Sequence, residues 1–304
     1  DYTKALSLSR LAYDLENLVS PALAGLILLA TSWQALLSGT VVGFIASALL
    51  VVSVVLPSGS APQKRRGVFE RARRGFRIFF ATPRLRGLMA LNVVVSMAGS
   101  MVIVNTVVIV RGSFGLTEQH TAMAFAAFGG GSMLAAIALP TLLKRWKDRP
   151  VMLTGAWVLL GGLGAALFAD SIETLLPVWV FLGTGFSSVQ TPIGRLLTQS
   201  SHGEDRPALF AAQFSLSHAG WLFAYPLAGW LGSSAGIQLT LMLLATLGLA
   251  FLIAAIRLWP ADDPLVLAHS HADLPSNHPH RVESGPEHSH RYVIDELHPR
   301  WPGY

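Results

Sequence analysis

The 304-residue chain has no cysteine, and only 13% of its residues are charged. The lack of cysteine excludes disulfide bonds, thiolate metal sites and cysteine nucleophiles. A soluble domain carries about 25% charged residues, so the low charge content argues against a soluble fold. The sequence also lacks a phosphate-binding loop, a metalloprotease helix and a nucleophile elbow. We therefore expect no enzyme, no ATP-driven step and no required cofactor.

Long apolar stretches are what the sequence has in abundance, since 52% of its residues are hydrophobic. A bilayer core is about 30 Å thick, so a helix needs about 20 mostly apolar residues to cross it. No long alternating strand pattern occurs, and a membrane-spanning backbone must satisfy its own hydrogen bonds. These features predict an all-α polytopic membrane protein. Eight stretches are long and apolar enough: about 5–31, 36–56, 88–111, 119–143, 150–169, 174–198, 207–231 and 236–258.

Basic residues occur in every second connection between these stretches. The stretch 57–87 holds nine lysines and arginines and 144–149 holds four, whereas 112–118, 170–173 and 232–235 hold none. By the positive-inside rule, the basic connections and the C-terminal tail lie in the cytoplasm. We therefore expect a multi-pass protein of the plasma (bacterial inner) membrane. The net charge of +5 reflects this topology and gives no reason to expect a nucleic-acid partner.

Phenylalanines and arginines interleave within the basic stretch 57–87, from Phe69 to Phe80. This pattern fits an amphipathic helix that lies on anionic lipid. It fits equally well a solvated linker whose charges only set the topology. Either alternative places the stretch at the cytoplasmic surface.

A short motif of proline and small residues occurs in two predicted spans. Ser20–Gly25 reads SPALAG, and Tyr225–Gly229 reads YPLAG. Each is followed by a short neutral connection and a very apolar helix. Matched segments in two halves of a chain are typical of transporters built from parallel repeats.

On these features the chain resembles the major facilitator superfamily. Ser20–Gly25 resembles the glycine-proline motif in the fifth helix of its drug–proton antiporters, with Ser20 where glycine is usual. Residues 143–149 resemble the basic loop between helices eight and nine, which would make Asp148 and Arg149 gating residues, although the expected glycines are missing.

The resemblance implies helices five to twelve of an expected twelve, with the first four truncated. Residues 1–56 would be the last two helices of the N-terminal bundle, and 57–87 the central cytoplasmic loop. Residues 88–258 would form the C-terminal six-helix bundle, and 259–304 a histidine-rich, mostly disordered tail.

Polar side chains within the first predicted span are candidates for a proton site. Ionisable groups at mid-helix cost about 2.5–3.5 kcal/mol each on insertion scales, so they are functional candidates. At helical spacing Arg10, Asp14 and Asn17 share one face, and Arg10 can pair with Asp14. Glu16 points elsewhere. Either Asp14 or Glu16 is a proton-titrating carboxylate, or both lie near the cytoplasmic end and reach water.

Three further polar residues lie in later spans. His218 suits a proton relay because histidine titrates near neutral pH, or it is a hydrogen-bonded packing residue. Gln190 and Asn105 either line a polar cavity or form hydrogen bonds between helices.

The tail is rich in histidine. Imidazole binds nickel, cobalt and zinc, and the tract resembles the histidine-rich C-termini of nickel-resistance permeases in the superfamily. The alternative is a solvated tail that binds metal only incidentally. Val293, Ile294, Leu297 and Trp301 recur at helical spacing, which predicts a short amphipathic turn that docks on the cytoplasmic face. The candidate ligands form three His-x-His pairs: His269, His271, His278, His280, His288 and His290.

Together these features predict a secondary active transporter that works by alternating access. We expect proton-coupled efflux of a small molecule or a divalent transition-metal ion. Its partners would be the bilayer, the substrate and protons, and the protein would be a monomer. The alternative is a non-transporting membrane metal sensor or scaffold that acts through the tail.

Overall fold

The computed structural model describes residues 33–53, 67–270 and 287–302. The first predicted span, about 5–31, lies outside these residues. Helix α2 (Trp33–Ser53) is 21 residues long and corresponds to the second predicted span. Its described side chains are exposed around the whole helix, and most are apolar.

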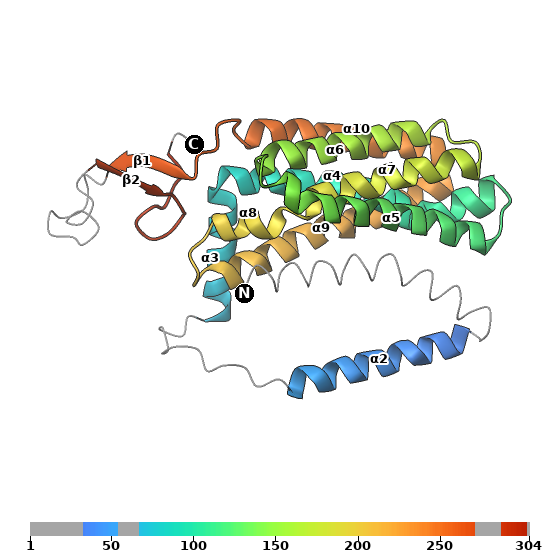
Figure 1. Cartoon of the computed structure of the whole chain (residues 1–304), viewed down its shortest axis with the longest axis horizontal. Helices are drawn as coiled ribbons and strands as arrows, with labels where there is room; N and C mark the ends of the chain where they lie inside the picture. Colours follow the sequence, from blue (N-terminus) through green and yellow to red (C-terminus); the bar gives the residue numbers. More distant parts are fainter. Residues whose placement is uncertain (1–32, 54–66, 271–286, 303–304) are drawn as a thin grey trace.

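Among the described residues, the six long helices α4, α5, α6, α7, α9 and α10 run side by side as a bundle (Figure 1). Helix α4 begins at Pro83, directly after Thr82, whose extended backbone separates it from the preceding helix. At its far end α4 continues into a π-helical turn, and α7 is followed by a short helix, α8. The elements of the bundle are α4 (Pro83–Val107), η1 (Val108–Ser113), α5 (Glu118–Leu142), α6 (Asp148–Ala166), α7 (Ile172–Gln190), α8 (Ile193–Gln199), α9 (Arg206–Ser234) and α10 (Ile237–Leu258).

Five helical stretches in the described residues are long and apolar enough to cross a membrane. They are Pro83–Ser113, Glu118–Leu142, Asp148–Ala166, Ile172–Gln199 and Ile237–Leu258. The helical bundle that the sequence predicts is therefore confirmed, but eight spans are not. Helix α9 has 29 residues, and its polar side chains, His218 among them, reduce its mean hydropathy.

The bundle is held together by close contacts between helices. Helix α4 packs against both α9 and α10, and α7 packs against α5 and α6. Glycines allow the closest approach, because a methyl group at Gly131 of α5 would collide with the carbonyl oxygen of Val180 in α7. A methyl group at Gly183 would likewise collide with the carbonyl oxygen of Phe128. Small residues have this role in membrane helix packing generally.

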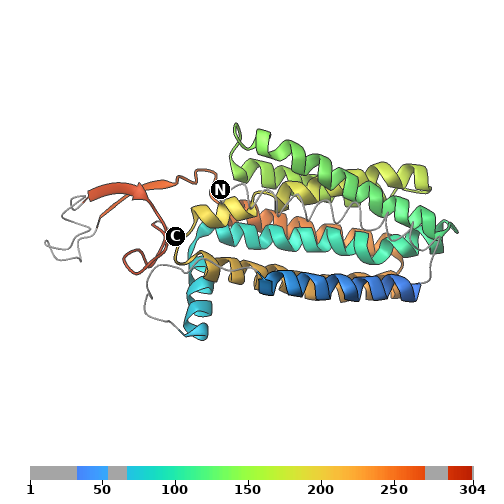
Figure 2. The same ribbon diagram turned by 60° about the horizontal axis from the view of Figure 1, so that its bottom comes forward.

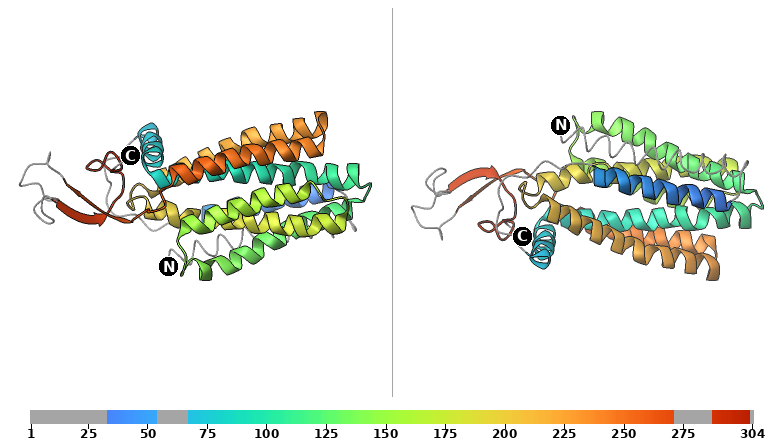
Figure 3. Two further views of the ribbon diagram at one scale, coloured as in Figure 1. Left: turned by 90° about the horizontal axis from the view of Figure 1, so that it is seen from above. Right: turned by 90° about the horizontal axis from the view of Figure 1, so that it is seen from below.

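Helix α3 (Val68–Ala81) crosses the end of the bundle at a steep angle, as Figures 2 and 3 both show. We call this end, where α4 begins and α10 finishes, the tail end. Ile78 and Phe79 are buried there, and Gly75 lies against the backbone of Ala208 in α9. Phe69 stays 83% exposed. Residues 68–81 of the basic stretch thus form a helix that packs on the bundle at the tail end, which favours an amphipathic helix over a solvated linker.

The tail continues the chain beyond α10 at the same end (Figure 1). Strands β1 (Val266–Ser270) and β2 (Glu287–Arg291) pair antiparallel. The expectation of a mostly disordered tail therefore does not describe these residues. In β2 the His-x-His spacing of His288 and His290 matches the two-residue period of a strand, which places both histidines on one face.

Residues 292–302, which we call the C-terminal segment, return from the hairpin to the bundle. Val293, Ile294 and Trp301 are buried, as the predicted docking requires. The predicted helical turn is absent from this segment. Instead, Asp295 Oδ1 accepts hydrogen bonds from the backbone nitrogens of Leu297 and His298, at 2.8 and 2.7 Å. Such side-chain bonds stabilise a turn in place of a helix.

Candidate functional site

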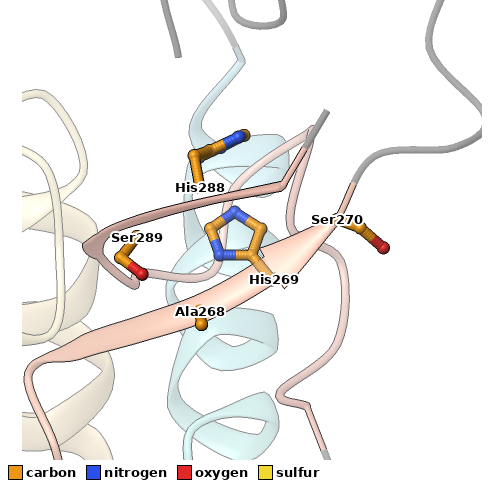
Figure 4. Close-up of a pocket in the computed structure, with 5 residues that line it drawn as sticks. All are labelled: Ala268, His269, Ser270, His288 and Ser289. Atoms are coloured by element: carbon orange, nitrogen blue, oxygen red, sulfur yellow. The ribbon is translucent and has the colours of Figure 1, made fainter. Parts of the chain in front are cut away.

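Three histidines gather on the hairpin: His269 from β1, and His288 and His290 from β2 (Figure 4 draws the first two). The strand register pairs His269 directly with His288 and Leu267 with His290. Residues two apart on a strand point to the same side, so the three rings share one face. One ligating atom from each lies within 4.8 Å of those of the other two.

Hydrogen bonds to the backbone orient two of these rings. His269 Nδ1 lies 3.0 Å from the Leu267 carbonyl oxygen, and His290 Nδ1 lies 2.8 Å from that of Arg291. A carbonyl oxygen can only accept, so Nδ1 is the donor in both rings, and Nε2 carries the lone pair when the ring is neutral. Burial lowers the pKa of His269, which favours the neutral imidazole that binds metal.

The chemistry of this cluster suits a divalent transition-metal ion. Imidazole nitrogens prefer zinc, nickel, cobalt and copper to magnesium or calcium. Ala268, Ser270 and Ser289 complete the lining of an open pocket around His269 and His288 (Figure 4). Of the six predicted ligands, His271, His278 and His280 lie outside the described residues.

A network of charged residues joins the tail to the helices beside this cluster. Arg74 of α3 donates hydrogen bonds to Asp205 and, at 3.2 Å, to Glu296 of the C-terminal segment. Arg84 of α4 is 1% exposed, with its Nε 3.4 Å from Asp263 Oδ1. The ring of Trp301 lies 5.0 Å from the same guanidinium. The C-terminal segment is therefore fixed to the bundle by ionic and aromatic contacts.

The match to known proteins covers the bundle and reaches into the tail. A family model described as the Major Facilitator Superfamily matches residues 88–284, which is more than half of the chain. The chain belongs to the major facilitator superfamily. A search of curated proteins found no match. Membership indicates a secondary transporter, and with the apolar helices it makes this a multi-pass membrane protein.

The loop before α6 is where the superfamily resemblance placed a gating pair. Asp148 is buried at the start of α6, and Arg195 Nε of α8 lies 3.3 Å from its Oδ2. Arg149 Nε instead donates to the Trp259 carbonyl oxygen at 2.9 Å, just past the end of α10. Asp148 thus joins α6 to α8, and Arg149 joins α6 to the end of α10. Basic side chains at a helix C-terminus satisfy carbonyls that lack partners within the helix.

The polar residues predicted inside the superfamily bundle lie in separate surroundings. Asn105 is buried, and its Nδ2 donates to the Ala228 carbonyl oxygen of α9 at 3.1 Å, a hydrogen bond between helices. His218 is exposed on α9 and stacks on Phe214. Gln190 Oε1 is buried at the end of α7 and has no hydrogen-bond partner among the described residues. Within the described residues, no hydrogen bond joins the side chains of Asn105, His218 and Gln190 to one another.

The other predicted pathway residues, Arg10, Asp14, Glu16 and Asn17, lie outside the described residues. The sequence pattern gives no sign of the roles of Asp295, His298 and Arg84. His298 has no His-x-His neighbour. The signal that could have found the hairpin is the two-residue spacing of the histidines, which matches a strand.

Proposed function

We propose that this superfamily member is a proton-coupled secondary active exporter of divalent transition-metal ions. The observation that supports this most strongly is the cluster of His269, His288 and His290 at the tail end of the bundle. Three imidazoles within ligand distance give a site for zinc, nickel or cobalt, and do not suit an organic solute. The metal ion is the cargo and not a resident cofactor.

The proposed direction of transport is supported by where the basic residues lie. Helix α3 and the loop 143–147 carry exposed lysines and arginines at the tail end. The connections at the opposite end carry few charges. By the positive-inside rule the tail end is cytoplasmic, so the cluster would take up metal from the cytoplasm before export.

Proton coupling needs a group that titrates along the pathway. Asp14 and Glu16 are the candidate carboxylates, and His218 is a candidate relay in α9. Asp148, paired with Arg195, would contribute to closing the cytoplasmic side. The same protein would then exchange metal for protons by alternating access, as a monomer in the bacterial inner membrane.

Inside-out vesicles that contain the full-length protein test this proposal. Under an imposed pH gradient, we expect uptake of Ni²⁺, Co²⁺ or Zn²⁺ that collapses when the gradient is dissipated. Asp14→Asn should remove the gradient dependence, whereas the matched change Asp170→Asn, in the connection before α7, should leave it intact. Gradient-driven uptake of a cationic amphipathic drug without uptake of any metal would overturn the metal substrate.

A further inference from the structure

A fourth histidine reaches the cluster from the C-terminal segment. His298 is 3% exposed, and its Nε2 lies 3.0 Å from Nε2 of His269. Its other ring nitrogen, Nδ1, lies 2.9 Å from Oδ1 of Asp295. The ring centroids of His298 and His290 are 5.1 Å apart. The cluster of His269, His288 and His290 therefore lies beside a fourth histidine, which comes from the C-terminal segment.

The hydrogen bonds around these rings decide which nitrogens carry lone pairs. The Leu267 carbonyl oxygen and the Asp295 carboxylate are acceptors, so Nδ1 of His269 and Nδ1 of His298 are the protonated nitrogens. When both rings are neutral, each Nε2 presents a lone pair to the other across 3.0 Å. Two facing lone pairs repel unless a proton or a metal ion lies between them, so this pair of nitrogens either shares a proton or binds a metal ion.

The spacing of the two nitrogens matches the geometry of a bound metal ion. Zinc binds imidazole nitrogen at about 2.0–2.1 Å in a tetrahedron, which places neighbouring ligand nitrogens about 3.3 Å apart. The separation of 3.0 Å between His269 and His298 needs only a small adjustment to reach that value. Metal-binding histidines also commonly donate their other N–H to a carboxylate, as His298 does to Asp295.

We propose that His298 is the fourth ligand of a tetrahedral metal site with His269, His288 and His290, and that Asp295 is its positioning residue. The site takes a divalent transition-metal ion such as Zn²⁺. The inference deepens the proposed function, because it concerns the same cluster, but it is a statement about metal binding and can be tested without transport.

A four-histidine site of this kind would link the hairpin to the bundle. His202, in the connection between α8 and α9, lies 3.2 Å from the second oxygen of Asp295. Arg291 donates to the carbonyl oxygens of Thr198 and Gln199 at the end of α8. Metal bound to His298 therefore holds the C-terminal segment against α8 and α9, so occupancy of the site tightens the docking of the tail.

Metal titration of the purified full-length protein tests the ligand set. Wild-type protein and four variants are titrated with Zn²⁺ against a chromophoric chelator, and with Co²⁺ as a spectroscopic reporter of tetrahedral nitrogen ligands. Loss of an outer partner costs about 10–100-fold in affinity, so Asp295→Ala should weaken binding by that factor and Asp295→Asn, which keeps an acceptor oxygen, by less. His298→Gln should weaken binding at least as much as Asp295→Ala and change the Co²⁺ spectrum.

His120→Gln, at the start of α5 on the opposite end of the bundle, is the matched control and should bind as wild type does. Unchanged affinity and an unchanged Co²⁺ spectrum in His298→Gln would overturn the fourth ligand, even if the vesicles export metal. Tight binding that depends on His298, in a protein that exports no metal, would instead overturn the proposed function and keep this site.

The docking of the tail can be measured separately with one introduced cysteine, because the chain has no cysteine of its own. Val293→Cys places a single thiol at a buried position of the C-terminal segment. Zn²⁺ should slow its reaction with a maleimide several-fold, while Ser234→Cys, exposed at the opposite end, should react at the same rate with and without metal. Equal rates at position 293 in both conditions would show that metal does not tighten the docking.

Discussion

At the tail end of the bundle, Arg84 and Asp205 are nearly fully buried and each contacts a segment more than 100 residues away in the sequence. At the opposite end, Arg111 pairs with Glu118 at 3.2 Å, but both side chains are exposed and only seven residues separate them. Buried ions need partners, whereas exposed pairs are screened by water. The tail end is therefore an interface built from contacts between distant segments, whereas the described connections at the opposite end are short turns.

The largest effect should come from Arg84→Met. Removing one partner of a buried pair leaves the other charge unpaired, which typically costs about 3–5 kcal/mol. We expect about 3 kcal/mol here, because Asp263 keeps 15% of its side chain exposed. A thermal melt in detergent measures the loss. A melting temperature equal to that of the wild-type protein would mean that the buried ion pair at the tail end contributes no more stability than the exposed pair at the opposite end.

Bound metal should stabilise the tail end by nearly as much. A ligand that binds only the folded state contributes about 2.7 kcal/mol when its concentration is 100 times Kd. We therefore expect Zn²⁺ at that ratio to raise the melting temperature of the wild-type protein, and His269→Gln to remove most of the gain. A chelator should reverse the effect. A gain that survives in His269→Gln would place the responsible metal elsewhere.

Asn105→Ala tests a buried hydrogen bond inside the bundle, nearer to the opposite end. The change removes the hydrogen bond to Ala228, and the net cost of losing a buried hydrogen bond is about 1 kcal/mol. Stability should fall by that amount while metal binding stays unchanged. Loss of transport at full stability would instead show that Asn105 lines the pathway, which is the other sequence hypothesis.

The smallest effect is expected for Arg111→Gln at the opposite end. Exposed ion pairs contribute about 0–1 kcal/mol, and both partners here are more than half exposed. The melting temperature should therefore stay close to that of the wild-type protein, with little change when salt is added. Destabilisation comparable to that of Arg84→Met would abolish the distinction between the two ends.

The helical bundle could be predicted from the sequence because a bilayer imposes a minimum length on each apolar stretch. Helix α10 matches its predicted span of 236–258 closely. Helix α4 begins earlier than 88, because Pro83 is well placed at the first position of a helix and Thr82 breaks the preceding one. The described basic connections lie together at the tail end, and the side of the membrane on which they lie stays a prediction.

The candidate site could be predicted only in part. The histidines were identified from their composition, but their pairing depends on a strand register that brings His269 opposite His288. The role of His298 depends on a turn organised by Asp295, and the burial of Arg84 on a contact with Asp263. The strand pairing and the contact between Arg84 and Asp263 join residues far apart in the chain, and no local period in the sequence encodes them.

The docking of α3 has a consequence for how far the chain can rearrange. Because Gly75 lies against Ala208 of α9, α3 belongs with the bundle. The connection from α2 is then residues 54–67 and not the whole stretch 57–87. Fourteen residues span at most about 50 Å when fully extended. That length is an upper limit on the distance by which any motion can separate the end of α2 from the start of α3.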